Sequence, residues 1–269
     1  MKKIIPFVLL FSILPIHART NTATPNSPIL EPMKLERGVT VERDLISKDG
    51  RYLFWVNTGT WRVNGIMLNR ANNHQLNFIG TQKGYNLTLK SPSNAQQADE
   101  FIFTGTLNLP NNRIDGVLTT PNKQQAITFE PYIPIKNRPQ FQFKFFGVTD
   151  PNASYIRTIK QIQVISQGKV VQTLSGFEAR DYEAIYADYN FDGYFDLRLD
   201  IGEQATLDSC HQYWLYNPTS GKFVRDELLS SMTGSPSRYP EKNILRFNNT
   251  LLEMRNGKWY DLPCCAALN

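Results

Sequence analysis

Short apolar runs separated by turn signals limit this chain, more than any other feature, to a fold made of strands. Between residues 38 and 136 apolar side chains alternate with polar ones, and pairs such as Asp49-Gly50, Asn64-Gly65 and Lys83-Gly84 separate the runs. Alternation with a period of two is typical of half-buried strands, and turns at a spacing of about ten residues leave no room for long helices between them. We therefore expect an all-β chain that begins with an antiparallel meander closing as a barrel or a sandwich.

The pattern changes at residues 136–139, Lys-Asn-Arg-Pro, where we expect a domain boundary. Beyond it Phe141, Phe143 and Phe145 alternate strictly with polar residues, and further short strand patterns follow towards the C-terminus. They predict a C-terminal antiparallel sheet, with one short helix over residues 227–232 that Asp226 caps. The expected domains are a β-meander over residues 38–136 and a second β domain over residues 140–269.

The N-terminus has the pattern of an export signal. Lys2 and Lys3 precede an apolar stretch over residues 4–16, and Ala18 supplies a small residue at a cleavage position. A membrane-spanning helix needs roughly 20 apolar residues, so this stretch is too short, and the two lysines argue against the alternative of a buried strand. We expect a signal peptide over 1–18, release without a stable membrane anchor, and a linker rich in Pro, Asn and Thr over 19–37.

Three cysteines remain after the expected cleavage: Cys210, Cys264 and Cys265. In an oxidising compartment disulfides persist, so we expect a bond from Cys210 to Cys264 or Cys265, with a strained bond between the adjacent pair as the alternative. Because the count is odd, one thiol is left over or pairs between chains. No Cys-x-x-Cys spacing or histidine cluster favours zinc.

The loop that follows residue 187 contains the one strong chemical signal in the chain. Oxygen-bearing side chains stand at its first, third, fifth and ninth positions, and Gly193 at the sixth position permits a sharp turn. Ca²⁺ is a hard cation that takes six to eight oxygen ligands, and side chains at alternate positions converge on one centre when a loop curls. The predicted calcium ligands are Asp188, Asn190, Asp192, Asp196 and the backbone carbonyl of Tyr194.

This loop does not match an EF-hand. An EF-hand needs an acid at the twelfth position, which here is Leu199, and it needs helices on both sides. The flanking residues 184–187 and 197–199 have the pattern of strands instead, so we expect a calcium hairpin within a sheet. The alternative is an Asx-rich turn whose side chains bond to their own backbone. Mg²⁺ is less favoured, because it keeps its waters.

Other functional classes leave weaker signals. The net charge of +5 comes from scattered residues, which is typical of a solvated surface and not of a nucleic-acid interface. Asp181 and Glu183 could form the carboxylate pair of a glycosidase, but an acidic turn explains them equally well. His74 and His211 are far apart in sequence, and we find no nucleophile elbow, phosphate loop or zinc-protease motif. We therefore expect a protein that is not an enzyme.

The segment from Ala187 to Leu199, together with the later Tyr213–Pro218 and Gly221–Val224, carries a resemblance to a known family. It resembles the periplasmic immunity proteins that neutralise lysozyme-like effectors of xanthomonad-type type IV secretion systems. Their hallmark is an Asp-x-Asn-x-Asp-Gly-x-x-Asp loop followed by an aromatic segment, and both stand here in that order. The loop is also similar to the FG-GAP calcium loops of propeller blades, so the C-terminal sheet is expected to resemble one blade; a single copy cannot form a whole propeller.

The resemblance implies a periplasmic calcium-binding protein that inhibits a lysozyme-like peptidoglycan hydrolase. The family's inhibition is tied to a Tyr-x-x-x-Lys motif, and Tyr132 with Lys136 is the literal match in this chain, whereas Tyr155 and Lys160 miss the spacing by one residue. Further basic candidates for the contact are Lys160, Lys169 and Lys222. The alternative function is a calcium-stiffened module that binds envelope components or glycans without inhibiting an enzyme.

Overall fold

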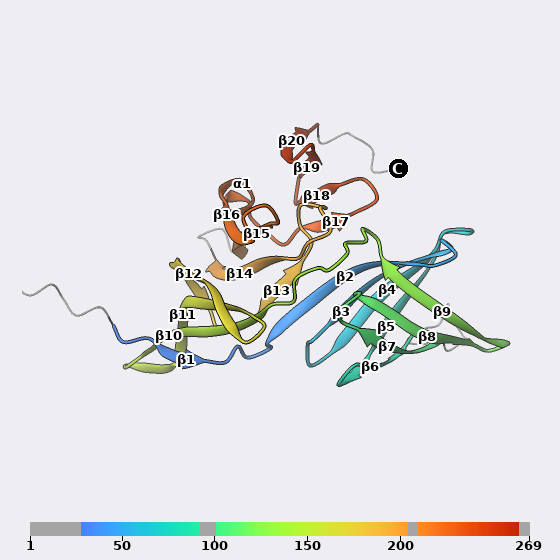
Figure 1. The fold of residues 1–269 in the computed structure, drawn as a ribbon, viewed down its shortest axis with the longest axis horizontal. Coiled ribbons are helices and arrows are strands. Elements are labelled where there is room, and N and C mark those ends of the chain that lie inside the picture. Colours follow the sequence, from blue (N-terminus) through green and yellow to red (C-terminus); the bar gives the residue numbers. More distant parts are fainter. Residues whose placement is uncertain (1–27, 92–100, 204–208, 264–269) are drawn as a thin grey trace, which may run out of the picture.

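The fold was analysed in a computed structural model, which describes residues 28–91, 101–203 and 209–263. Within these ranges the chain forms twenty strands and one short helix, so the predicted all-β class is confirmed. The strands make three sheets: an N-terminal barrel that continues into the strands of the acidic loop, a second sheet that packs against these loop strands, and a C-terminal sheet (Figure 1).

Eight strands form the antiparallel barrel in the N-terminal part of the chain. They are β2 (Val39–Ser47), β3 (Tyr52–Thr58), β4 (Val63–Asn69), β5 (His74–Lys83), β6 (Asn86–Lys90), β7 (Ile102–Asn108), β8 (Arg113–Thr120) and β9 (Lys123–Pro131). Each strand pairs with the next, and β9 returns to β2, where Leu45 faces Pro131 and Ser47 faces Phe129. Of the two predicted forms of the meander, barrel or sandwich, the structure has the barrel.

Aromatic side chains fill the barrel. The Phe54 ring lies 4.9 Å from that of Phe129 and 5.4 Å from that of Phe103, between ring centroids. The inward positions of every barrel strand contribute apolar side chains to this core. Because the alternation of the sequence places these residues on one face of each strand, the barrel interior is a packed core and not a channel.

Strand β2 belongs to two pairings along the same edge. Its second half closes the barrel against β9, whereas its first half pairs in parallel with β13 (Ala184–Ala187), where Val39 faces Ala184. The sheet then continues through β14 (Asp196–Glu203), β15 (Ser209–Asn217) and β16 (Lys222–Asp226). The sheet therefore divides beside residues 42–44, and we call this point the fork.

The second sheet contains β1 (Glu31–Met33), β10 (Gln142–Asp150), β11 (Ala153–Ser166) and β12 (Lys169–Arg180). It packs on one face of the β13–β16 strands through a core that includes Ile162, Leu174 and Leu197. The last part of the predicted linker 19–37 contains strand β1, which pairs with β10 because Met33 fills this core. The domain limits themselves stay a prediction, and the hydrogen bonds between β2 and β13 join the two expected domains in one sheet.

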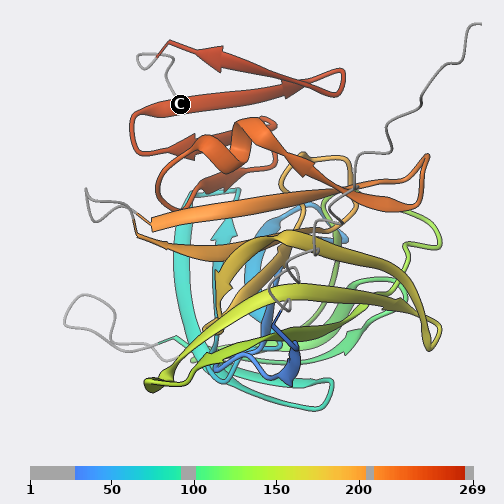
Figure 2. The same cartoon turned by 90° about the vertical axis from the view of Figure 1, so that its left-hand side faces the viewer.

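The third sheet consists of β17 (Ser237–Tyr239), β18 (Ile244–Phe247), β19 (Thr250–Arg255) and β20 (Lys258–Leu262). Together with α1 (Glu227–Ser231) it covers the other face of β13–β15, with Leu229 and Leu245 against Tyr213. Figure 2 shows β10–β12 on one side of the β13–β16 strands and the C-terminal hairpins on the other. The predicted cap is present: Asp226 accepts a hydrogen bond from the Leu229 amide at 2.8 Å.

Within the described ranges, none of the helical structure is long and apolar enough to cross a membrane. The predicted signal peptide, residues 1–18, lies outside these ranges, and so do Cys264 and Cys265. Cys210 is buried at the start of β15. Its predicted bond to one of the last two cysteines therefore stays a prediction.

Candidate calcium loop and the charged fork

The acidic loop joins β13 to β14, and Ala187 faces Asp196 in the last pair of the hairpin. The flanks are strands, as the sequence predicted. Two residues with left-handed backbone angles bend the loop: Gly193 with φ of 86° and Phe191 with φ of 57°. A bulky residue rarely adopts this conformation, and the buried ring of Phe191, packed in the core beneath the third sheet, holds it there.

The first three predicted side-chain ligands bond to the loop's own backbone. Asp188 accepts from the amides of Asp192 at 3.2 Å and Gly193 at 2.8 Å. Asp192 accepts from the Tyr194 amide at 2.8 Å, and the Asn190 amide group donates to Asp192 at 3.0 Å. The structure thus brings these three side chains together around one turn. A carboxylate oxygen accepts more than one contact, so these bonds leave lone pairs for a cation.

Asp196 differs from the other three because it is fully buried. One of its oxygens accepts from the Tyr189 amide and the other from the Tyr216 amide, both at 2.8 Å. Its carboxylate therefore ties the start of the loop to β15. The spacing in the sequence predicted only that Asp196 is a metal ligand. Because it is the first residue of β14, its carboxylate also holds the two ends of the loop together.

The loop carries more negative charge than its surroundings balance. Burial and repulsion from Asp192 raise the pKa of Asp188 to about 7, and burial also raises the pKa of Asp192 and, most of all, of Asp196. Among the described residues these three carboxylates make no ion pair within 4 Å. The neighbouring cations, Arg138 and Arg238, oppose the shifts only from a distance.

The donor atoms are of the chemical type that calcium prefers, because they are hard oxygens on a curled loop. In the part of the chain that the structure describes, no three acidic, histidine or cysteine side chains converge closely enough to form a metal cage by themselves. A complete shell would need the Asn190 amide oxygen, the Tyr194 carbonyl and waters beside the carboxylates. The predicted ligand set thus has the right chemistry, and its metal stays a prediction.

Arg238, from β17, ties the fork to the loop. Its Nε lies 3.2 Å from a Glu42 oxygen, its Nη1 forms an ion pair with Asp44, and the same nitrogen donates to the backbone oxygen of Asp188 at 3.3 Å. The barrel strand β2, the acidic loop and the third sheet therefore meet at one guanidinium group.

The predicted inhibitory segment rests on this loop. A Cβ placed on Gly193 would lie 2.5 Å from Ile135 Cγ1 and 2.8 Å from Ile133 Cγ2, so the segment touches the loop where only glycine fits. The Tyr132 amide donates to the backbone oxygen of Asp44 at 2.9 Å, and the Lys136 side chain is exposed. Two features that the sequence predicted separately, about 50 residues apart, lie side by side.

The other basic candidates lie elsewhere. Lys160 forms an ion pair with Glu178 at 2.8 Å, Lys169 is exposed at the β11–β12 turn, and Lys222 donates to the Val171 oxygen. The side chain of Tyr155 lies outside the described residues. The structure therefore does not bring these lysines to the acidic loop.

The carboxylates considered for a glycosidase have structural partners. Asp181 pairs with Arg157 at 2.9 Å, and Glu183 accepts a hydrogen bond from the Thr40 hydroxyl. His74 is exposed, whereas His211 is buried. Burial, together with the charge of Arg198, lowers the pKa of His211 to about 4, so this imidazole is neutral at neutral pH.

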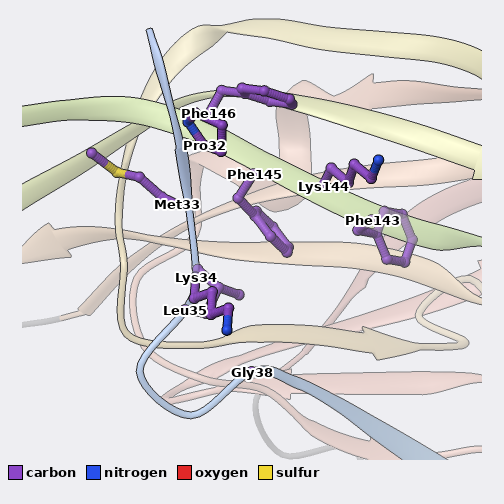
Figure 3. Close-up of a pocket in the computed structure, with 9 residues that line it drawn as sticks. All are labelled: Pro32, Met33, Lys34, Leu35, Gly38, Phe143, Lys144, Phe145 and Phe146. Carbon is purple, nitrogen blue, oxygen red and sulfur yellow. The ribbon is translucent and has the colours of Figure 1, made fainter.

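A wide surface hollow of about 600 Å³ lies where β1 crosses β10 (Figure 3). Its walls are mostly apolar, from Met33, Leu35, Phe143 and Phe145, and Lys34 and Lys144 stand at the edge. Figure 3 shows Phe143 and Phe145 on the same side of β10, as the alternation of a strand requires. The hollow is open and contains no buried polar group that would define a ligand.

Two buried arginines, Arg43 and Arg138, are candidates that the sequence analysis missed. A signal existed for Arg43, because it stands between Val41 and Leu45 in the alternation of β2 and so points to the same side as these apolar residues. Nothing in the sequence marked Arg138, which lies in an irregular segment.

Comparison with known proteins adds no relative: the chain matches no protein-family model, no curated protein and no solved structure.

Proposed function

We propose that this protein binds one Ca²⁺ in the acidic loop and uses the segment above the loop to inhibit a lysozyme-like peptidoglycan hydrolase in the periplasm, as an immunity protein against a secreted effector. The observation that carries the proposal is the close approach of Ile133 and Ile135 to Gly193, because the exposed Lys136 directly follows Ile135 in the chain, next to the loop that calcium would stiffen.

Calcium is supported by the electrostatics of the loop. The carboxylates of the buried Asp188 and Asp196 and of the half-buried Asp192 repel one another, and their pKa values rise because burial removes water from the charged forms. A bound dication compensates this charge and keeps the loop in one conformation. Asp188, Asn190, Asp192 and the Tyr194 carbonyl would hold the ion, and Asp196 would complete or brace the shell.

Inhibition is supported by complementarity of charge. A hydrolase of this class presents paired carboxylates in its cleft. Lys136 offers a cation directly after a segment that the Tyr132 amide anchors to the barrel and two isoleucines anchor to the loop. A contact that is ordered before binding loses less entropy when the complex forms.

A calcium-stiffened module that binds glycans is the second candidate, and an exposed aromatic residue favours it. Trp61, in the β3–β4 turn, is 68% exposed, and the Arg37 guanidinium lies 5.8 Å from its ring and 4.3 Å from the Tyr182 ring. Trp and Tyr side chains are enriched at binding interfaces because they combine a large apolar ring with a polar group.

The test measures the lysis of cell walls by turbidity, with the hydrolase encoded beside this gene or, failing that, a c-type lysozyme. The proposal predicts that a molar excess of the protein with Ca²⁺ stops lysis and that Lys136→Ala weakens the inhibition by at least about tenfold, because a buried charge pair is lost. Lys123→Ala, an exposed lysine at the β8–β9 turn, is the matched control. Full lysis by every hydrolase would contradict inhibition, and retention of polysaccharide that depends on Trp61 would favour the module.

A further inference from the structure

A cavity of about 280 Å³ lies at the fork, between the first half of β2, the segment 138–143 and the end of the acidic loop. Its walls are apolar for the most part and include Val41, Phe141, Tyr186 and Phe195. Arg43 and Arg138 also line it, so the cavity brings two cationic side chains to one place.

Arg138 has no partner for much of its guanidinium group. The residue is 8% exposed, and its Nε and Nη1 atoms are buried without a hydrogen bond. Its Cζ lies 4.4 Å from the centre of the Phe195 ring, which supports the cation without accepting its hydrogen bonds. A charged group whose buried donors lack acceptors lowers the stability of the folded state. The unsatisfied donors of Arg138 therefore point to an acceptor that the protein binds from solution.

Arg43 is 5% exposed and has neutral partners only. Its Nε donates to the Thr58 hydroxyl at 3.1 Å and its Nη1 donates to the Asn112 side-chain oxygen. Burial, with repulsion from Arg138 as the second cause, lowers the pKa of Arg43 to about 9. Within the described ranges neither arginine forms an ion pair, and two buried positive charges therefore repel each other across the cavity.

The acids of the calcium loop do not satisfy Arg138. Asp188 and Asp192 attract it and raise its pKa against the effect of burial. Asp188 shares a much smaller hollow with Arg138, behind Phe195, and neither acid comes within ion-pair distance. The charge of Arg138 is thus balanced only at long range, while its Nε and Nη1 atoms stay without a hydrogen bond.

We propose that this cavity binds a small organic acid, a carboxylate carried on an apolar body, with Arg138 and Arg43 holding the anionic group. The planar guanidinium group of an arginine pairs with a carboxylate through charge-assisted hydrogen bonds, and the orphaned Nε and Nη1 donors of Arg138, which lie on two different edges of that group, each have room in their hydrogen-bonding capacity for one such bond. The aromatic walls would cover the apolar body. The volume lies near the lower end of small-molecule sites, about 300–1,000 Å³, so the ligand has about the size of one ring with a short chain.

This proposal does not rest on inhibition or on calcium. The test titrates the full-length protein with 3-phenylpropionate by calorimetry and by thermal melting. The uncharged 3-phenylpropionamide and inorganic phosphate are the control ligands, since each supplies only one half of the proposed recognition. The acid should bind and raise the melting temperature, because a ligand of the folded state stabilises it, and neither control should.

Arg138→Met is the decisive variant, because methionine keeps an apolar stem and removes the cation. Binding of 3-phenylpropionate should weaken by at least about tenfold, and the ligand-free variant should melt no lower than the wild type, since an unpaired buried charge is gone. Arg138→Lys, which keeps the charge but loses the planar fork, should bind with intermediate affinity and serves also if the Met variant does not fold. Arg246→Gln, an exposed arginine on β18, is the matched control and should bind as the wild type does.

A purely structural arginine would give the opposite pattern: a lower melting temperature in Arg138→Met and no response to the acid. Equal binding of acid and amide would overturn the role of the arginines. Binding of phosphate in preference to the acid would overturn the apolar part of the ligand.

Discussion

The barrel and the fork are built from opposite kinds of core, although they share strand β2. Apolar side chains fill the centre of the barrel, where Phe54, Phe103 and Phe129 are in contact. A few residues away, at the fork, charged side chains are buried or nearly so: Arg43, Asp44, Arg138, Asp188, Asp196 and Arg238.

This difference separates the part of the molecule that stabilises the fold, the barrel core, from the part that can bind ions, the fork. Burial of apolar area stabilises a fold without further requirements. Buried charges that lack close partners weaken a fold, and apolar residues of similar size often replace even well-paired ones without loss. The fork therefore has a physical reason to bind ions. A cation in the acidic loop and an anion in the two-arginine cavity would each neutralise buried charge that has no close partner within the protein.

The largest expected effect is in the barrel. Phe54→Ala should lower the free energy of unfolding by about 3–5 kcal/mol, because it opens a cavity among packed rings. Urea denaturation measures the loss, and Ile66→Ala on the outer face of β4 is the control, with a much smaller effect because Ile66 is 37% exposed. Similar losses in both variants would contradict a barrel core centred on Phe54.

At the fork, the effect of Asp188→Asn on the free energy of unfolding should have opposite signs without and with calcium, and it should depend on pH. The pKa of Asp188 is about 7 in the folded chain and about 3.9 when unfolded, so the metal-free folded state binds more protons and loses stability as pH rises from about 4 to about 7. Without metal at about pH 8 the asparagine variant should therefore be more stable than the wild type, by at least ~1.4 kcal/mol, the equivalent of one pKa unit.

Saturating Ca²⁺ should reverse the order, because the wild type then gains a ligand that the variant binds poorly. Melting curves at about pH 5 and about pH 8, each with EDTA and with calcium, cover the four cases. An asparagine variant that is less stable than the wild type in EDTA at both pH values would show that the carboxylate is a structural group without excess charge.

Gly193→Ala should show how closely the loop and the segment above it are coupled. The substitution adds strain at a φ of 86° and drives a Cβ into Ile133 and Ile135, so we expect a loss of about 1–3 kcal/mol and weaker inhibition. Gly257→Ala is a sharp control, because its φ of 73° is equally unfavourable but no atom lies within 4 Å of the new Cβ. If both variants melt alike and inhibit alike, the packing on Gly193 carries no functional contact.

The smallest expected effect on stability belongs to Lys136→Ala. The side chain is exposed and away from packed features, so the free energy of unfolding should stay within about 0.5 kcal/mol of the wild type. A larger loss in the same melting assay would mean that Lys136 is part of the fold, and a loss of inhibition could then not be assigned to the contact.

Much of the fold was readable from the sequence, because period-two alternation and turn pairs are local signals. They predicted the all-β class, the meander, the strands on both sides of the acidic loop and the helix that Asp226 caps. The parallel pairing of β2 with β13 was not readable, since it joins residues more than 140 positions apart. Strand β1 was hidden within a proline-rich segment, because three residues with Met33 as the buried anchor make too short a pattern.

The candidate site was readable only where one segment contains it. The spacing of Asp188, Asn190 and Asp192 in the sequence identifies them as candidate ligands. The proximity of Ile135 to Gly193, and the presence of Arg43 and Arg138 in one cavity, depend on the tertiary fold. The second role of Asp196, which bonds to the Tyr216 amide of β15, could not follow from the spacing of a loop. Predictions from local patterns therefore found the loop and missed the charges that face it.

Calcium binding by the acidic loop is the central claim, and calorimetric titration of the metal-free protein tests it most directly. We predict one Ca²⁺ bound per chain, loss of that binding in Asp192→Ala, and unchanged binding in Asp261→Ala, an exposed acid on β20. At about 100 times its Kd, calcium should also stabilise the wild type by about 2.7 kcal/mol. No heat of binding and no change in melting on addition of Ca²⁺ would contradict the claim, and equal binding by Asp192→Ala would place the ion elsewhere.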